Sequence, residues 1–316
     1  MISREQIEAL KSFGKVKLNE PLSKYTTFKI GGPADVFLVI LNTDNLVRAF
    51  QFLEGEGIPF FVLGGGSNTL VRDEGFRGVC IKVVAQELHI DGVTVTADAG
   101  CITAEVAQAS IRAGLTGFEW GVGVPGTIGG AVRGNAGAVG FEMQHNVQAV
   151  RVYENGEVQD YTNADCAFTY RESVFKHKSV YVLQVTLALQ TGSNAEALKK
   201  AMEYLAFRTA TQPQGFSSGC IFKNVPLVSF QNAKKDAPAL LPEFEKKGIV
   251  SAGWMIQESH AKGLSVGKAT VSDKHGNFIL NTGGATADDV LRLIDKVKAN
   301  VYDTFGISLE EEVYIL

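Results

Sequence analysis

Nine glycines fall between Gly117 and Gly140, in a stretch where only Glu119 and Arg133 carry a charge. Glycine has no side chain, so a run of this density indicates that the main chain approaches a neighbour closely. The N–H groups of glycine turns and helix starts form anion sites, which favours a phosphate-bearing ligand. A shorter run, LGGGSN at 63–68, repeats the pattern. Two runs predict a long cofactor, such as a dinucleotide, held at more than one point.

The long run also contains a literal G-x-G-x-x-G, formed by Gly121, Gly123 and Gly126. Pro125 interrupts it, further glycines follow, and no acid stands at the ~20-residue distance that a Rossmann ribose contact requires. We therefore expect the run to bind a flavin pyrophosphate in a different fold. A glycine-rich loop with a purely structural role is the other interpretation.

The composition excludes several classes of protein. The chain has 316 residues, of which 45% are hydrophobic and 20% charged, and its net charge is −4, which gives no electrostatic basis for binding nucleic acid or an anionic membrane. No apolar run approaches the ~20 residues that span a bilayer. Ser3 and Gln6 form a capping-box pattern rather than a signal peptide, so we expect a cytoplasmic protein. The four cysteines and five histidines lack metal-ligand spacing, and we expect no metal.

Hydrophobic periodicity predicts mixed helices and strands. Strands are expected at 35–41, 58–63, 180–189 and 311–316, and helices at 103–113, 193–209, 252–261 and 286–304. Asn155-Gly156 predicts the turn of a hairpin. Pro, Gly and Ser gather in TQPQGFSSG at 211–219, which predicts a domain boundary there.

Seven motifs occur in an order that resembles a known family. They are YTTFKIGGPAD (25–35), LGGGSN (63–68), GVPGTIGGAVRGNAG (123–137), YRES (170–173), GCIFKN (219–224), SAGWMIQ (251–257) and LEEEV (309–313). Together they are similar to the UDP-N-acetylenolpyruvoylglucosamine reductases, the MurB family of bacterial cell-wall synthesis. The resemblance covers essentially the whole chain.

The resemblance implies an α+β protein with the FAD-binding fold of the flavin oxidase (PCMH-type) superfamily. Its expected parts are two FAD-binding subdomains, 1–75 and 76–213, and a substrate-binding domain at 214–316. Non-covalent FAD would be the cofactor, NADPH the hydride donor, and the enolpyruvyl ether of a UDP-sugar the substrate. The expected FAD residues are Gly64, Gly65, Gly66, Ser67, Asn68, Gly123, Pro125, Gly126, Thr127, Gly129, Gly130 and Gly134.

The expected catalytic residues match the chemistry of such a reduction. Hydride transfer from flavin N5 to the terminal carbon of an enolpyruvyl ether leaves negative charge on the adjacent carbon and its carboxylate, and a fixed cation stabilises that charge. Arg171 in YRES supplies a permanently charged, planar donor. Glu312 in LEEEV matches the family's active-site glutamate, although Glu310 and Glu311 stand beside it. The resemblance also places Tyr170, Lys223, Asn224, Lys274 and His275 at the substrate.

Cys220 departs from the commonest member of the family, which has a serine at this position as proton donor. A thiol has a reference pKa of about 8.5, so it is mostly protonated at neutral pH and is a stronger acid than a hydroxyl. We predict that Cys220 is neutral and donates the proton that completes the reduction, with Glu312 opposing its ionisation. The nearby Lys223 would favour the thiolate, which cannot donate. A small buried packing residue is the other interpretation of Cys220.

Two alternative functions belong to other classes. One is a flavin oxidase of the same superfold; many of those tether flavin through a histidine near the first glycine run, whereas this chain has Ser67 and Asn68 there. The other is a non-catalytic nucleotide-sugar-binding relative. Arg171 and Cys220 lie 49 positions apart, which resembles the family's shorter second type without an inserted substrate-covering segment.

Overall fold

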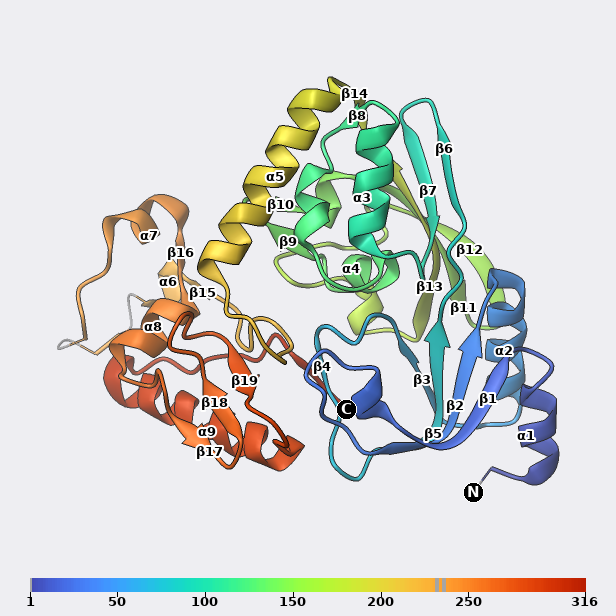
Figure 1. Ribbon diagram of the computed structural model, residues 1–316, viewed down its shortest axis with the longest axis horizontal. Helices are drawn as coiled ribbons and strands as arrows, with labels where there is room; N and C mark the ends of the chain where they lie inside the picture. Colours follow the sequence, from blue (N-terminus) through green and yellow to red (C-terminus); the bar gives the residue numbers. More distant parts are fainter. Residues whose placement is uncertain (1, 231–232, 235–236) are drawn as a thin grey trace. The chain divides into compact units, whose positions relative to one another are not determined.

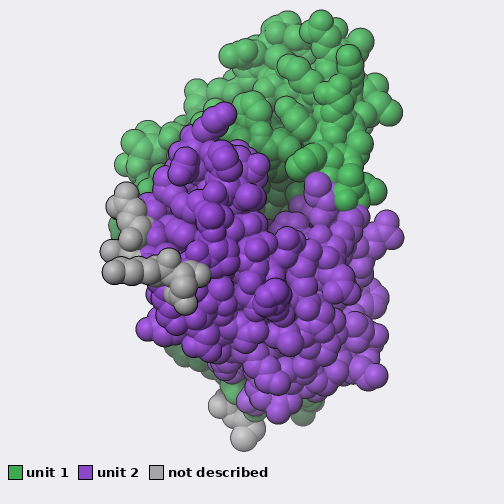
Figure 2. Space-filling model, turned by 90° about the vertical axis from the view of Figure 1, so that its left-hand side faces the viewer, with its two compact units in different colours: residues 1–20, 34–65, 76–210 green, residues 21–33, 66–75, 211–316 purple. Residues whose placement is uncertain are grey.

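The computed structural model describes residues 2–230, 233–234 and 237–316, which form two compact units (Figures 1 and 2). Unit 1 comprises 1–20, 34–65 and 76–210, and unit 2 comprises 21–33, 66–75 and 211–316. Two short segments of the N-terminal third therefore belong with the last hundred residues. The division into three domains stays a prediction.

A four-stranded sheet opens unit 1, with strand order β1-β2-β5-β3. The strands are β1 (Lys15–Pro21), β2 (Pro33–Ile40), β3 (Phe60–Leu63) and β5 (Phe76–Val83). β5 pairs in parallel with both β2 and β3. Its buried residues Val79 and Ile81 pack with Leu10 of helix α1 (Arg4–Leu10) and Phe50 of α2 (Thr43–Gly55). The predicted capping box of Ser3 and Gln6 is present at α1.

A five-stranded antiparallel sheet forms the rest of unit 1, in the order β12-β11-β13-β7-β6. Its strands are β6 (Leu88–Asp91), β7 (Thr94–Asp98), β11 (Val147–Glu154), β12 (Glu157–Thr162) and β13 (Val180–Ala188). The hairpin turns at Asn155 and Gly156, both with positive φ, as predicted. Tyr153 and Tyr181 pack against Phe50 of α2, with ring centroids 5.1 and 4.7 Å away, and so join this sheet to the first.

Helices α3 (Thr103–Arg112), α4 (Ile128–Arg133) and α5 (Asn194–Thr211) share one buried core with the five-stranded sheet (Figure 1). Val106 of α3 and Ile128 of α4 share a buried core with Val95 and Ala97 of β7. The shorter elements are β8 (Leu115–Thr116), η2 (Glu119–Gly123), β9 (Gly137–Ala138), β10 (Phe141–Glu142), η3 (Met143–His145), η4 (Val174–Lys176) and β14 (Gln190–Thr191). Gly121 and Gly123 lie in the 3₁₀ turn η2, not after a long strand, so the Rossmann interpretation is excluded.

Unit 2 is built around α9 (Ala287–Phe305), whose apolar stripe includes Val290, Leu293 and Val297. This stripe packs on α8 (Ala252–Glu258) and on a small sheet of β17 (Ser265–Val266), β18 (Ala269–Val271) and β19 (Ile279–Asn281). The remaining elements are η1 (Leu22–Lys24), β4 (Thr69–Leu70), β15 (Val225–Pro226), α6 (Leu227–Phe230), α7 (Pro242–Lys247), β16 (Ile249–Val250) and β20 (Tyr314–Ile315).

The last strand differs from the sequence prediction. β20 spans only Tyr314–Ile315 and pairs in parallel with β4. The acids before it do not continue this ladder, because their main chain pairs with residues 221–223 instead: Lys223 donates to the carbonyl oxygen of Glu310, and Glu312 donates to that of Ile221. This pairing places the C-terminal residues beside the segment 66–75 within unit 2.

Candidate active site

The two glycine runs meet inside unit 1. A Cβ built on Gly65 would lie 2.4 Å from the Cα of Gly126, and one on Gly64 would lie 2.6 Å from Oγ1 of Thr127. Gly126 also has φ +97°, a conformation that side chains rarely adopt. The sequence could not predict this meeting, since about sixty residues separate the runs. The main chains thus pack directly against each other.

Three main-chain N–H groups at this meeting point have no acceptor among the described residues: those of Gly65, Gly126 and Thr127. Thr127 is 4% exposed. Gly65 and Gly126 are half-buried. Buried N–H groups are nearly always paired, so the buried N–H of Thr127, without a protein acceptor, indicates a ligand. Donors that need an acceptor, on glycines that leave room, fit the pyrophosphate of FAD.

Other glycines of the long run are explained by protein packing. A Cβ on Gly129 would lie 2.7 Å from the Cβ of Ala99, and one on Gly123 would lie 2.5 Å from Cδ of Arg208. The N–H of Gly129 donates to Ala99 and that of Gly130 to Oγ1 of Thr127. These N–H groups at the start of α4 are therefore bonded to protein acceptors. They are not open to a phosphate, as the N–H groups of a free helix start would be. Pro125 and Gly130 are exposed, and Gly134 follows the end of α4.

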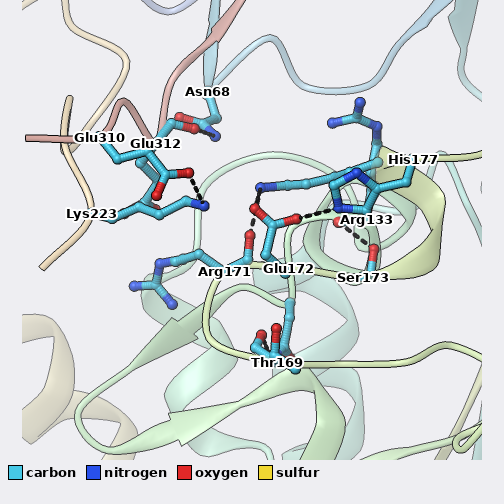
Figure 3. Close-up of polar contacts among 12 residues, drawn as sticks. Asn68, Arg133, Thr169, Arg171, Glu172, Ser173, His177, Lys223, Glu310 and Glu312 are labelled. Atoms are coloured by element: carbon cyan, nitrogen blue, oxygen red, sulfur yellow. Dashed lines mark hydrogen bonds and ion pairs between the residues drawn. The ribbon is translucent and has the colours of Figure 1, made fainter. Parts of the chain in front are cut away.

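The rest of the first run belongs to unit 2. A Cβ on Gly66 would lie 2.1 Å from the carbonyl oxygen of Tyr25, so only glycine fits there. Ser67 is half-buried. Asn68 donates through Nδ2 to the carbonyl oxygen of Glu312, 3.0 Å away (Figure 3). A residue expected at the cofactor therefore also fixes the main chain of the expected catalytic glutamate.

Arg171 lies at the tip of a tight turn in unit 1 (Figure 3). Thr169 and Glu172 exchange two main-chain hydrogen bonds of 3.1 and 3.0 Å, which leaves Tyr170 and Arg171 between them. Arg171 has φ +58°, a strained conformation for a residue with a side chain. Its guanidinium lies 5.3 Å from the ring centroid of Tyr170.

Side chains around this turn hold it in place. Lys176 donates to the carbonyl oxygen of Arg171 and forms an ion pair of 3.5 Å with Glu172. His177 also contacts Glu172, at 2.9 Å (Figure 3). Asn135, fully buried, donates to the carbonyl oxygen of Thr169 at 2.8 Å. None of these supports was singled out from the sequence.

Gly137 connects the glycine tract to the same arginine. Arg171 donates through Nη2 to its carbonyl oxygen at 3.3 Å. A Cβ on Gly137 would lie 3.1 Å from Nη1 of Arg171 and 2.5 Å from the carbonyl oxygen of Phe141. The tract therefore makes room for the arginine as well as forming the meeting point of the two runs.

Cys220 and Glu312 are brought together in unit 2 by main-chain bonds. The carbonyl oxygen of Ile221 accepts from the N–H of Glu312 at 2.7 Å and from that of Val313 at 3.4 Å. Phe222 forms a bridge with Glu311, and Cys220 forms one with Phe278. The residue next to the thiol is thus bonded to the main chain of the glutamate.

The three adjacent acids have different surroundings. Glu310 forms an ion pair of 2.6 Å with Lys223, and Glu311 forms one of 2.9 Å with Lys298. Glu312 instead has both its N–H and its carbonyl oxygen bonded, to Ile221 and Asn68. Its main chain is the most tightly held of the three.

Of the four expected substrate residues in unit 2, three are half-buried, namely Lys223, Asn224 and His275, and Lys274 is exposed. Asn224 accepts through Oδ1 from the N–H of Ala252 at 3.1 Å, which fixes the start of α8. His275 accepts through Nδ1 from the N–H of Asn277 at 3.2 Å, and burial lowers the pKa of its imidazole.

Asn277 is a residue that sequence reasoning missed. It is 3% exposed and forms two hydrogen bonds with the main chain of Phe222: Oδ1 accepts at 2.9 Å and Nδ2 donates at 2.8 Å. Its own carbonyl oxygen accepts from Ile221. Its place in HGNF, between a glycine and a phenylalanine, was the available signal.

The other three cysteines are buried thiols. Burial raises the pKa of Cys101 to about 11 and that of Cys166 to about 12, and it raises the pKa of Cys80 further. Cys220 is half-buried. Within residues 2–230, 233–234 and 237–316, no group of three or more His, Cys, Asp or Glu is arranged to hold a metal, and no helix is long and apolar enough to cross a membrane.

Comparisons with known proteins agree with these features. The family model described as UDP-N-acetylenolpyruvoylglucosamine reductase, C-terminal domain, matches residues 212–316, and that of an FAD binding domain matches residues 34–162. The second match confirms the predicted FAD-binding fold and FAD as the cofactor.

The chain also has full-length relatives. It is 38% identical over 315 residues to the UDP-N-acetylenolpyruvoylglucosamine reductase of Caldanaerobacter subterraneus subsp. tengcongensis, covering 99% of this chain and 97% of that protein. The reductase of Heliobacterium modesticaldum is 39% identical over 308 residues, covering 96% and 91%. The crystal structure of the reductase (MurB) from Thermus caldophilus superposes with a TM-score of 0.76 at 34% identity, covering 95% and 98%. The chain therefore belongs to the UDP-N-acetylenolpyruvoylglucosamine reductase family.

Proposed function

We propose that this chain reduces the enolpyruvyl ether of UDP-N-acetylglucosamine to the lactyl ether, UDP-N-acetylmuramate, a precursor of peptidoglycan. The observation that carries the proposal is the main-chain pairing of the Cys220 segment with Glu312 in a chain that matches this family over its whole length. The proposed location is the cytoplasm, with residues 214–316 binding the UDP-sugar.

The glycine runs would hold FAD, which when bound would supply hydride transfer from NADPH to the terminal enolpyruvyl carbon. The chain's own residues handle the charge and the proton. Arg171 binds the substrate carboxylate, because its guanidinium keeps its charge and donates in a planar fork. The strained turn, supported by Lys176 and Asn135, fixes the direction of that fork before substrate arrives.

Cys220 then donates its Sγ proton to the carbon beside the carboxylate. One hydride and one proton convert the carbon–carbon double bond to a single bond, and the thiolate regains a proton from water. Glu312 opposes ionisation of the thiol, since a nearby carboxylate disfavours a second negative charge. In its protonated form the same carboxyl polarises the developing enolate by donating a hydrogen bond to it. Lys223 and Asn224 contact the nucleotide sugar in this proposal, as do Tyr170, Lys274 and His275.

The experiment follows the reoxidation of NADPH-reduced flavin in anaerobic stopped flow, with and without UDP-N-acetylglucosamine enolpyruvate. The enolpyruvyl sugar should accelerate reoxidation and yield UDP-N-acetylmuramate. Equal rates with and without it would reject the proposal. In a separate aerobic run without the sugar, rapid reoxidation by oxygen would instead support the flavin oxidase. Purified protein without yellow flavin absorbance would support the non-catalytic binding protein.

A further inference from the structure

Lys82 is a half-buried cation that the proposed reaction does not use. It lies on β5, between Val39 of β2 and Leu63 of β3 in the register of the sheet. Burial lowers the pKa of its ammonium. No carboxylate among the described residues lies within ion-pair distance of it. A buried charge without a counter-charge destabilises a fold, so its presence calls for an explanation.

The ammonium is directed at the first glycine run. Lys82 donates through Nζ to the carbonyl oxygen of Gly64, the residue that follows β3. The peptide between Gly64 and Gly65 is trans, since the residues that the structure describes include no cis peptide bond, and in a trans peptide the N–H points opposite to the C=O. A lysine that holds the oxygen of Gly64 therefore turns the N–H of Gly65 away from itself.

That N–H is one of the three donors without an acceptor among the described residues. Gly65 packs on Gly126, so its N–H lies where the two glycine runs meet. Lys82 thus fixes the direction of the Gly65 N–H and places a positive charge without a carboxylate partner next to the same peptide. Both effects favour a phosphate group over a neutral ligand.

We propose that Lys82 is a positioning residue for the pyrophosphate of FAD, which it serves by orienting the Gly64–Gly65 peptide and by supplying the compensating charge. This rests on the binding of FAD at the glycine runs. The proposal adds to the role of the glycines, because it assigns the selectivity for a charged cofactor to a side chain on β5.

Arg77 provides a matched control on the same strand. It is also cationic, but its side chain is 76% exposed and it pairs with Asp35 at 2.8 Å. Replacing either residue by methionine removes one positive charge and keeps an unbranched side chain. Only Lys82→Met removes the contact with the glycine run.

The test measures FAD binding to the flavin-free full-length chain by flavin fluorescence, together with the melting temperature of each flavin-free variant. Lys82→Met should weaken FAD binding at least tenfold and reduce its dependence on salt concentration, whereas Arg77→Met should change it less than twofold. The melting temperature of flavin-free Lys82→Met should equal or exceed that of the wild type, since an uncompensated buried charge is gone. Lys82→Arg should recover part of the affinity.

Two results would overturn the inference: unchanged FAD affinity in Lys82→Met, or weakened affinity accompanied by a lower melting temperature, which would show a purely structural lysine. Failure of the wild type to bind FAD is a different outcome. It would reject the cofactor assignment on which the proposed function rests, and it is read from the wild type alone.

Discussion

The expected catalytic residues occupy two differently built regions. Arg171 lies in a turn formed by Thr169, Glu172 and Lys176, all within five residues of it in the chain. Asn135 and Gly137 of the glycine tract add one hydrogen bond each. Cys220 and Glu312 lie far apart in the chain, and the main-chain bond from Glu312 to Ile221 links their segments. The side chains of Asn68 and Asn277 support this link by bonding to the main chain of Glu312 and Phe222. The arginine turn is held mainly by residues close to it in the chain, whereas the pairing of Cys220 and Glu312 exists only when unit 2 is folded.

This difference predicts how each region fails. A change at the arginine turn should affect the handling of substrate charge while unit 1 stays folded. A change in the supports of the Cys220 region should lower the stability of unit 2 before it affects chemistry. Cys220 is the exception, since its bridge with Phe278 is formed by the main chain and stays in place when the side chain is changed.

The largest expected effect comes from Cys220→Ala. Loss of a positioned proton donor should slow product formation by about 10²- to 10⁴-fold. Flavin reduction by NADPH should stay within about twofold, because only the second half-reaction needs this proton. Stopped flow separates the two halves. Cys220→Ser is the control and should keep most of the activity, since a hydroxyl also carries a proton; equal loss in both half-reactions would reject the role of donor.

Arg171→Lys should have the next largest effect. The substitution keeps the charge but loses the planar fork, and charge-assisted hydrogen bonds contribute about 1.5–3 kcal/mol. We expect kcat/KM for the enolpyruvyl sugar to fall about 10- to 100-fold, with flavin reduction unchanged. Steady-state kinetics with saturating NADPH measure this. Arg151→Lys, an exposed arginine on β11, is the control and should leave kcat/KM unaltered.

The helices, strands and candidate residues of both regions were more predictable than the contacts between distant segments. Motifs named Arg171, Cys220 and Glu312 alike, and hydrophobic periodicity predicted β2, α3, β13 and α9 nearly to their ends. The sequence did not predict the contact of Gly65 with Gly126 or the role of Asn68 and Asn277, because these depend on how distant segments meet. It also assigned Gly123 and Gly129 to the cofactor, and the places of their missing side chains are taken by protein atoms.

Asn277→Ala tests the non-local region through stability. It removes two hydrogen bonds to the buried main chain of Phe222 and leaves those groups without partners. We expect a loss of about 2–4 kcal/mol in the free energy of unfolding, at about 1–2 kcal/mol for each buried group left unpaired. Urea denaturation measures it. Asn300→Ala, which loses one long bond of 3.4 Å on α9, should cost far less; equal costs would show that Asn277 is not a special support.

The smallest expected effect concerns the pH dependence of unit 2 and the imidazole of His275. Burial, the larger cause, and the charge of Lys262 both lower its pKa in the folded state. Between that lowered value and the ordinary pKa of about 6.5, the unfolded chain binds the proton that the folded chain resists. Stability should therefore be full above pH 6.5 and fall as the pH drops toward the folded pKa.

Melting temperatures between pH 7.5 and 5 should fall less for His275→Gln than for the wild type, whereas the exposed His177→Gln should follow the wild type. Parallel curves for His275→Gln and the wild type would show that this imidazole does not couple protonation to the folding of the region that holds Cys220 and Glu312.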